Sequence, residues 1–204
     1  MTLGANSSPI DDIRSIVNTS SGNTGWSISE FLYRMGHEVI CIAGNTSLTP
    51  GFKLPDVRHR TSPDEMLNEA KQVSKEEVPD VWIFSAAVLD YVPEVITGKI
   101  PSGDANISIS LLPTKKQIPE ILSSMEGCFS IGFKLESNTD YSELIEKAKS
   151  HMDRYSLDAV VANRLQDLDD PDTPRCWIVD SNGSTTEIPD LQSLCLKIEE
   201  YISN

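Results

Sequence analysis

The feature that most constrains the fold is an alternation of short apolar runs, rich in β-branched residues, with longer amphipathic segments. Apolar residues at helical spacing in these longer segments predict helices. Strands that alternate with helices form parallel sheets covered by helices on both faces. The sequence therefore predicts a doubly wound α/β fold with a mostly parallel sheet. The predicted strands are residues 38–43, 81–87, 128–133, 159–162 and 175–179, and the predicted helices are residues 25–35, 62–74, 141–154 and 190–202.

Residues 106–112 differ from these runs, because Ile107, Ile109 and Leu111 alternate with serines. A period of two predicts a half-exposed strand or the arm of a hairpin. The chain has 204 residues, of which 39% are hydrophobic, and this is enough for one sizeable core and short for two. No internal repeat and no interdomain linker is visible. Residues 1–204 are therefore expected to form a single α/β domain.

Composition limits the partners and the compartment. A formal net charge of −14 disfavours nucleic acid and membrane surfaces as partners, and it also opposes phosphate-bearing ligands. An anion site must therefore be built locally, from backbone N–H groups, a few cations or a divalent metal. The longest apolar run, residues 81–89, is shorter than the roughly 20 residues that cross a bilayer. Four widely spaced cysteines without a CxxC pair, and an N-terminus that does not resemble a signal, indicate a cytoplasmic protein.

The turn at residues 18–25 is the first candidate binding element. Its sequence, Asn-Thr-Ser-Ser-Gly-Asn-Thr-Gly, directly precedes a predicted helix. Glycines let the backbone approach a ligand closely, and serine hydroxyls with free helix N–H groups can hold phosphate oxygens. The same pattern fits a simple helix cap, and the chain contains neither GxGxxG nor the P-loop pattern GxxxxGK[ST]. The turn alone therefore leaves both interpretations open.

Four sequence blocks in a fixed order carry a more specific resemblance. Pro9-Ile-Asp-Asp-Ile-Arg14 with Asn18-Thr-Ser-Ser-Gly22 resembles the EPID-VR-I-N-SSG-G stretch of phosphopantothenoylcysteine synthetases, the ligase half of bifunctional coenzyme A biosynthesis flavoproteins. Ser85-Ala-Ala-Val-Leu-Asp-Tyr91, followed by Lys99-Ile100, is similar to the AAVADY and KI elements of that family. Gly132-Phe-Lys-Leu-Glu136 and Asp158-Ala-Val-Val-Ala-Asn163 resemble its GFK-E and DLIVAN segments.

The resemblance implies a Rossmann-like domain with a small strand extension used for dimerisation, and a phosphopantothenate–cysteine ligase of coenzyme A biosynthesis. Its substrates would be 4'-phosphopantothenate, L-cysteine and a nucleoside triphosphate, with CTP favoured over ATP. Mg²⁺ is expected with the nucleotide, although its protein ligands stay unknown. No flavin is expected, because 204 residues leave no room for the decarboxylase half. A homodimer is implied, because family members pair through strands that correspond to residues 99–112.

The resemblance also assigns roles to single residues. Asn18 matches an asparagine that holds the pantothenate chain and the acyl-nucleotide, and a side-chain amide offers both a donor and an acceptor. Lys99 matches a lysine on a flexible strand that closes over the site, where it would meet developing negative charge. Both are candidate catalytic residues. The candidate nucleotide-binding residues are Ser20, Ser21, Gly22, Gly25, Ser85, Ala86, Asp90 and Phe133, with Asp90 against the nucleotide and Phe133 stacked near the base.

The chain departs from the family pattern in two respects. Its first strand is abbreviated, because residues 1–8 stand where the family has a full strand and a Gly-Gly-Thr turn. In addition, Asn23, His151 and Tyr155 stand where basic residues often occur. We therefore expect the triphosphate to be held mainly by Mg²⁺ and by the N–H groups of residues 20–25, with few side-chain cations.

Two other functions stay open on the sequence. A non-catalytic relative would bind a nucleotide or a pantothenate derivative without turnover, and the abbreviated strand and missing lysines favour it. An NAD(P)-binding reductase of the short-chain type is the weaker alternative, because the chain lacks GxGxxG and any Tyr-xxx-Lys pair.

Overall fold

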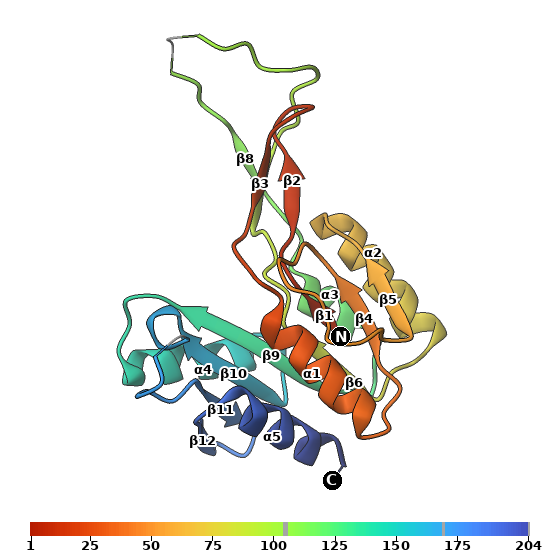
Figure 1. Ribbon diagram of the computed structural model, residues 1–204, viewed down its shortest axis with the longest axis vertical. Coiled ribbons are helices and arrows are strands. Elements are labelled where there is room, and N and C mark those ends of the chain that lie inside the picture. The colour runs from red at the N-terminus through yellow and green to blue at the C-terminus, as the bar shows by residue number, and fades with distance from the viewer. Residues whose placement is uncertain (104–105, 169, 204) are drawn as a thin grey trace.

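The computed structural model describes residues 1–103, 106–168 and 170–203. These residues form an eight-stranded sheet flanked by helices, with two small antiparallel hairpins beside it (Figure 1). Neighbouring strands of the sheet pair in parallel, except that β11 is antiparallel to both of its neighbours. The predicted α/β class with a mostly parallel sheet is confirmed. From edge to edge the strands are β12 (Thr185–Ile188), β11 (Cys176–Asp180), β10 (Ala159–Arg164), β9 (Phe129–Glu136), β6 (Val81–Phe84), β1 (Thr2–Leu3), β4 (Ile40–Ala43) and β5 (Asp56–His59).

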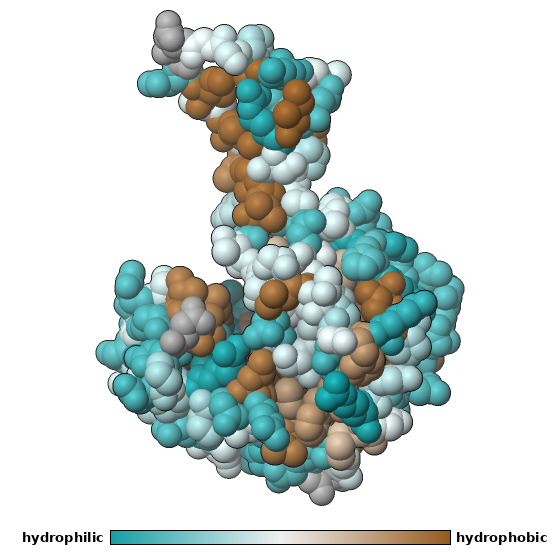
Figure 2. Space-filling view, in the orientation of Figure 1, coloured by the Kyte–Doolittle hydropathy of each residue, from teal (hydrophilic) through white to brown (hydrophobic). Residues whose placement is uncertain are grey.

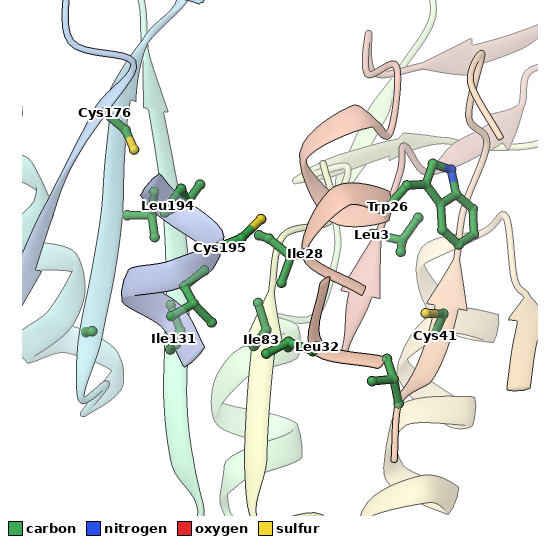
Figure 3. Close-up of a cluster of buried hydrophobic side chains, with 14 of the residues drawn as sticks. Leu3, Trp26, Ile28, Leu32, Cys41, Ile83, Ile131, Cys176, Leu194 and Cys195 are labelled. Atoms are coloured by element: carbon green, nitrogen blue, oxygen red, sulfur yellow. The ribbon is translucent and has the colours of Figure 1, made fainter. Parts of the chain in front are cut away.

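Helices cover both faces of the sheet, and each face has its own hydrophobic cluster. Helices α1 (Asn23–Arg34) and α5 (Leu191–Ser203) cover the front face in Figure 1, and Figure 3 shows Trp26 and Ile28 of α1 gathered with Leu194 and Cys195 of α5 around the sheet. Helices α2 (Pro63–Glu76), α3 (Gln117–Leu122) and α4 (Tyr141–Tyr155) cover the other face. No helix among the described residues is long and apolar enough to cross a membrane.

Strand β1 confirms that the first strand is abbreviated, since it has only two residues. Both are buried at the centre of the sheet, where they pair with β4 and β6. Gly4 follows with a φ of +75°, and a Cβ at that position would lie 2.8 Å from the carbonyl oxygen of Asn45. The backbones on either side of Gly4 therefore converge too closely for any larger residue.

The two hairpins build an extension that leaves the body of the molecule (Figure 1). One pairs β2 (Ser7–Pro9) with β3 (Ser15–Val17), and the other pairs β7 (Tyr91–Pro93) with β8 (Leu111–Pro113). We call the described residues within 7–17 and 91–113 the arm.

The sequence of residues 106–112 predicts a half-exposed strand or the arm of a hairpin. The structure forms a strand only at Leu111 and Leu112, which pair with β7 in a hairpin. Within the described chain, no backbone hydrogen bond is made by residues 106–109. Alternation of apolar and polar residues cannot build a ladder without a neighbouring strand. The pattern instead leaves Ile107 and Ile109 58% and 38% exposed.

Candidate functional site

A cavity of about 760 Å³ opens beside the carboxyl ends of β1, β6, β9 and β10. Its wall takes in Gly4 after β1, Ala86 after β6 and Asn163 of β10, together with the turn that begins α1 and the last turns of α4. The chain runs to opposite sides of the sheet from β1 and β6, so that crevice is the switch point at which open α/β sheets bind ligands.

The turn before α1 presents free N–H groups to this cavity. Gly22 adopts a φ of +80°, and the N–H groups of Gly22 and Asn23 are accepted by the hydroxyls of Ser20 and Ser21 at 3.3 and 3.2 Å. Helical bonding starts only at Trp26, whose N–H donates to Gly22 O. Within the described residues the N–H groups of Thr24 and Gly25 find no acceptor. Ser20, Ser21, Gly22 and Gly25 all line the cavity, as a phosphate-holding turn requires.

Gly25 is required by packing. A Cβ there would lie 2.5 Å from Leu3 Cβ and 3.1 Å from Ser85 Oγ, so α1 would have to move away from β1. We expect Gly25→Ala to lower the free energy of unfolding by about 1–3 kcal/mol and to weaken nucleotide binding. Chemical denaturation and nucleotide titration would measure both, with the exposed neighbour substitution Asn23→Ala as the control for stability. Equal stability of the two variants would contradict the tight contact.

Four predicted residues on other elements reach the same cavity: Ser85, Ala86, Asp90 and Phe133. The N–H and hydroxyl of Ser85 both donate to Thr2 O, at 3.1 and 2.9 Å, so this serine ties β6 to β1. The backbone N–H and carbonyl of Ala86 have no partner within the described chain and are free to bind a ligand. Asp90 Oδ1 accepts from Lys116 Nζ at 2.5 Å, and this bond raises the pKa of Lys116.

The two candidate catalytic residues do not line the cavity. Asn18 lies close to the cavity, between β3 and the turn before α1, and its Nδ2 donates to Ala87 O at 3.1 Å. Lys99 lies on the arm, with an exposed side chain that forms no ion pair with any described residue. The structure therefore brings together the predicted nucleotide-binding residues and leaves Lys99 apart from them.

Sequence reasoning missed the cations of the site. Five of the chain's 17 lysines and arginines line the cavity, against one of its 31 acids, Asp90. The expectation that few side-chain cations hold the triphosphate stays a prediction, although five basic side chains line this cavity. One of the five cations, Lys134, lies inside a recognised sequence block that could have indicated it, as does Asn163 of the cavity wall. The other four cations lie outside every recognised block. The five are Lys115, Lys116, Lys134, Arg154 and Arg175.

The contacts of Arg175 and the burial of His151 determine the charge that each brings to the cavity. Arg175 bridges two elements, because its guanidinium donates to Thr24 Oγ1 at 3.0 Å and to Leu168 O at 3.4 Å. His151 stands where a basic residue was expected, but burial and the nearby Lys134 and Arg154 lower its pKa to about 4. His151 is therefore neutral at physiological pH, while Arg175 supplies a fixed charge beside the first turn of α1.

No cluster of three or more His, Cys, Asp or Glu residues suited to a metal occurs in the described part of the chain. Mg²⁺ commonly binds through substrate phosphates with one or two carboxylates rather than in a protein cage. Asp90 is the carboxylate that faces the cavity, so the residues fit a magnesium ion that arrives with a nucleotide.

Comparisons with known proteins agree with the sequence blocks. Residues 1–198 match the family model described as the DNA/pantothenate metabolism flavoprotein C-terminal domain. The chain is 36% identical over 167 residues to the coenzyme A biosynthesis bifunctional protein CoaBC of Thermococcus kodakarensis, a match that covers 81% of this chain and 41% of that protein. The chain spans less than half the length of the curated relatives it matches.

Solved structures share the fold. The DNA/pantothenate metabolism flavoprotein from Streptococcus pneumoniae superposes with a TM-score of 0.85 at 26% identity, covering 98% of this chain and 97% of that one. A Cab2 variant in complex with phosphopantothenate-cysteine superposes with a TM-score of 0.73 at 20% identity, covering 100% and 87%. The match over almost the whole chain is decisive: this chain belongs to the DNA/pantothenate metabolism flavoprotein C-terminal domain family, the phosphopantothenate–cysteine ligase domain family that its sequence blocks resemble.

Proposed function

We propose that this chain is a phosphopantothenate–cysteine ligase that uses a nucleoside triphosphate in coenzyme A biosynthesis. The observation that carries the proposal is the charge of the cavity, where five cations and one carboxylate line the wall in a chain of net charge −14. Such a local reversal of charge suits an anionic ligand. The full name of the matched CoaBC proteins and the product bound to the Cab2 variant support the same substrates.

Two parts of the cavity would bind the phosphates and the base of the nucleotide. The free N–H groups of Thr24 and Gly25, with Arg175 beside them, would hold phosphate oxygens. The unpaired backbone groups of Ala86, with Phe133 nearby, would contact the base. The phosphopantothenate carboxylate oxygen then bonds to the α-phosphorus and pyrophosphate leaves. The cysteine amine next bonds to the acyl carbon, and the nucleoside monophosphate leaves as the amide forms.

Product formation tests this function directly. The protein is incubated with 4'-phosphopantothenate, L-cysteine, Mg²⁺ and either CTP or ATP, and pyrophosphate and phosphopantothenoylcysteine are measured. The ligase releases pyrophosphate with phosphopantothenate and forms the amide only when cysteine is added. Nucleotide binding without pyrophosphate release would favour the non-catalytic relative instead.

We expect CTP to bind at least about tenfold more tightly than ATP, because a mismatched base edge leaves buried polar groups unpaired at about 1–3 kcal/mol each. Mg²⁺ should strengthen the binding of either nucleotide, because it would neutralise phosphate charge and Asp90 could serve as its carboxylate ligand. Isothermal titration with both nucleotides, with and without Mg²⁺, measures both effects. Equal affinities for CTP and ATP would contradict base recognition, and metal-independent binding would contradict the role of Mg²⁺.

We also propose that the chain is a homodimer joined through the arm. Among the described residues, nine of the 17 exposed large hydrophobic residues lie on the arm, and Figure 2 shows apolar surface along its stem. Two-stranded hairpins are marginally stable alone, and an exposed apolar surface of this kind suits a second copy. Lys99, carried away from its own cavity, would then act at the cavity of the partner. Light scattering at micromolar concentration should give twice the mass of one chain, and a monomer would contradict the dimer.

A cytoplasmic location completes the proposal. It follows from the free state of all four cysteines, Cys41, Cys128, Cys176 and Cys195, of which only Cys128 is not fully buried. Reduced, unpaired thiols of this kind are typical of a reducing compartment.

A further inference from the structure

The tip of the β2–β3 hairpin holds the segment that carries Lys99. The N–H of Ile96 donates to Ile10 O at 2.8 Å, and the N–H of Asp12 donates to Gly98 O at 3.3 Å. On the other side of Lys99, the N–H of Ile100 donates to Asp11 Oδ2 at 2.9 Å. The backbone on both sides of Lys99 is therefore fixed to the hairpin, although the lysine side chain itself is exposed.

Asp11 is the centre of this arrangement. Its Oδ1 accepts from the N–H groups of Ile13 and Arg14 at 2.9 and 2.7 Å, which closes the hairpin turn. Its Oδ2 accepts from the Ile100 N–H and from Arg14 Nη1 at 2.5 Å. The N–H groups of Ile100, Ile13 and Arg14 and the Arg14 guanidinium hold the pKa of this carboxyl well below its usual range. Asp11 is therefore charged, buried and fully engaged.

Asp11 has no role in the cavity wall or in the packing of the body. It does not line the cavity, and the residues it contacts belong to neither hydrophobic cluster of the body. The neighbouring Asp12 is exposed, and no hydrogen bond or ion pair to its carboxylate is found within the described chain. The buried carboxylate thus serves the geometry of the arm alone.

We propose that Asp11 is a positioning residue of the ligase, which fixes the segment around Lys99 so that its ammonium group meets the reacting phosphate in one orientation. This proposal rests on the proposed function of the chain. It also explains the Pro9–Arg14 sequence block, which contributes nothing to the cavity wall. A fixed cation acts without the reorganisation that a freely moving lysine would need at the moment of reaction.

Asp11→Asn tests the proposal with little change of shape. The amide oxygen can still accept from Ile13 and Arg14, so the hairpin turn is kept. The amide nitrogen cannot accept from the Ile100 N–H or from the Arg14 guanidinium, so the bond beside Lys99 and the ion pair with Arg14 are both lost. We expect kcat to fall about tenfold or more, with KM for the nucleotide and the dimer mass unchanged and with a lower melting temperature, because the bonds of Asp11 to Ile100 and Arg14 are lost. Asp12→Asn removes the same charge one residue away and should leave kcat unchanged.

A double variant decides whether Asp11 acts through Lys99. Asp11→Asn should slow the wild-type enzyme but add no further loss to Lys99→Gln, because both substitutions remove the same interaction. Additive losses would overturn the proposal, as would a normal kcat for Asp11→Asn. Hydrogen exchange adds a readout that needs no turnover, since the Ile100 amide should exchange faster in Asp11→Asn than in Asp12→Asn. An unchanged exchange rate of the Ile100 amide would overturn the proposal even if the enzyme is active. Failure of the proposed ligase function would instead show as a wild-type protein without activity.

Discussion

Replacement of Lys99 by glutamine is expected to lower turnover about 100-fold or more and to leave the melting temperature unchanged. The side chain is exposed on the arm and makes no ion pair within the described chain, so the fold does not depend on its charge. The transition state of acyl-nucleotide formation develops negative charge on phosphate oxygens, and an ammonium group positioned there would stabilise it. Glutamine keeps most of the length and polarity of the side chain and removes the charge.

Steady-state turnover at saturating substrates, with thermal unfolding of the same preparations, measures this effect. Lys53→Gln is a matched control, because Lys53 is also exposed and lies outside both the arm and the cavity wall. Near-normal turnover of Lys99→Gln would show that Lys99 is only a solvated surface charge without a catalytic role.

Mixed dimers show which cavity Lys99 serves. Lys99→Gln and Asp90→Asn chains are co-expressed with different tags, and the dimer that carries both tags is purified. If Lys99 acts at the partner's cavity, one of the two sites in that dimer is intact, and about half of the wild-type activity per dimer returns. If Lys99 acts at its own cavity, every site carries one lesion and activity stays as low as in the single variants.

The fold was predictable where periodicity and length agree. The five predicted buried strands and all four predicted helices exist, because each buries an apolar run or face in the two clusters, whereas residues 106–112 form a strand only at their end. Some boundaries differ: β6 ends at Phe84, and residues 85–87, which still bond to β1 and the residues after it, line the cavity wall. Strands β5 and β12 were missed, since both lie at edges of the sheet and carry polar residues that give no apolar run. The prediction of a single domain stays a prediction.

The site was predictable only in part, for a physical reason. The turn around Gly22 and the segment around Ala86 present unpaired backbone groups to the cavity, and a glycine-rich or small-residue block reveals such segments. Side chains such as Lys115 and Arg175 come from the loop before α3 and from the residue before β11, and only the folded sheet brings them to one cavity. The position of Lys99 was also outside the reach of sequence, because it depends on how the hairpin tip holds the arm.

Asn18→Asp should slow amide formation strongly while sparing the nucleotide-dependent first step. The Asn18 amide donates to Ala87 O at 3.1 Å, and its Oδ1 has no partner within the described chain, so the side chain can accept from a ligand at the mouth of the cavity. A carboxylate cannot donate to Ala87 O, and it repels the phosphate of an acyl-nucleotide.

We expect the second step to slow about 100-fold or more, with nucleotide affinity retained, so the acyl-nucleotide should accumulate. Quench-flow assays that follow pyrophosphate and amide separately measure both steps, and Asn18→Ala separates loss of the hydrogen bond from added charge. If the charge is responsible, Asn18→Ala retains more amide formation than Asn18→Asp. A collapse of nucleotide affinity in Asn18→Asp, with a proportional fall in pyrophosphate release, would assign Asn18 to nucleotide binding instead, because the acyl-nucleotide would then never form.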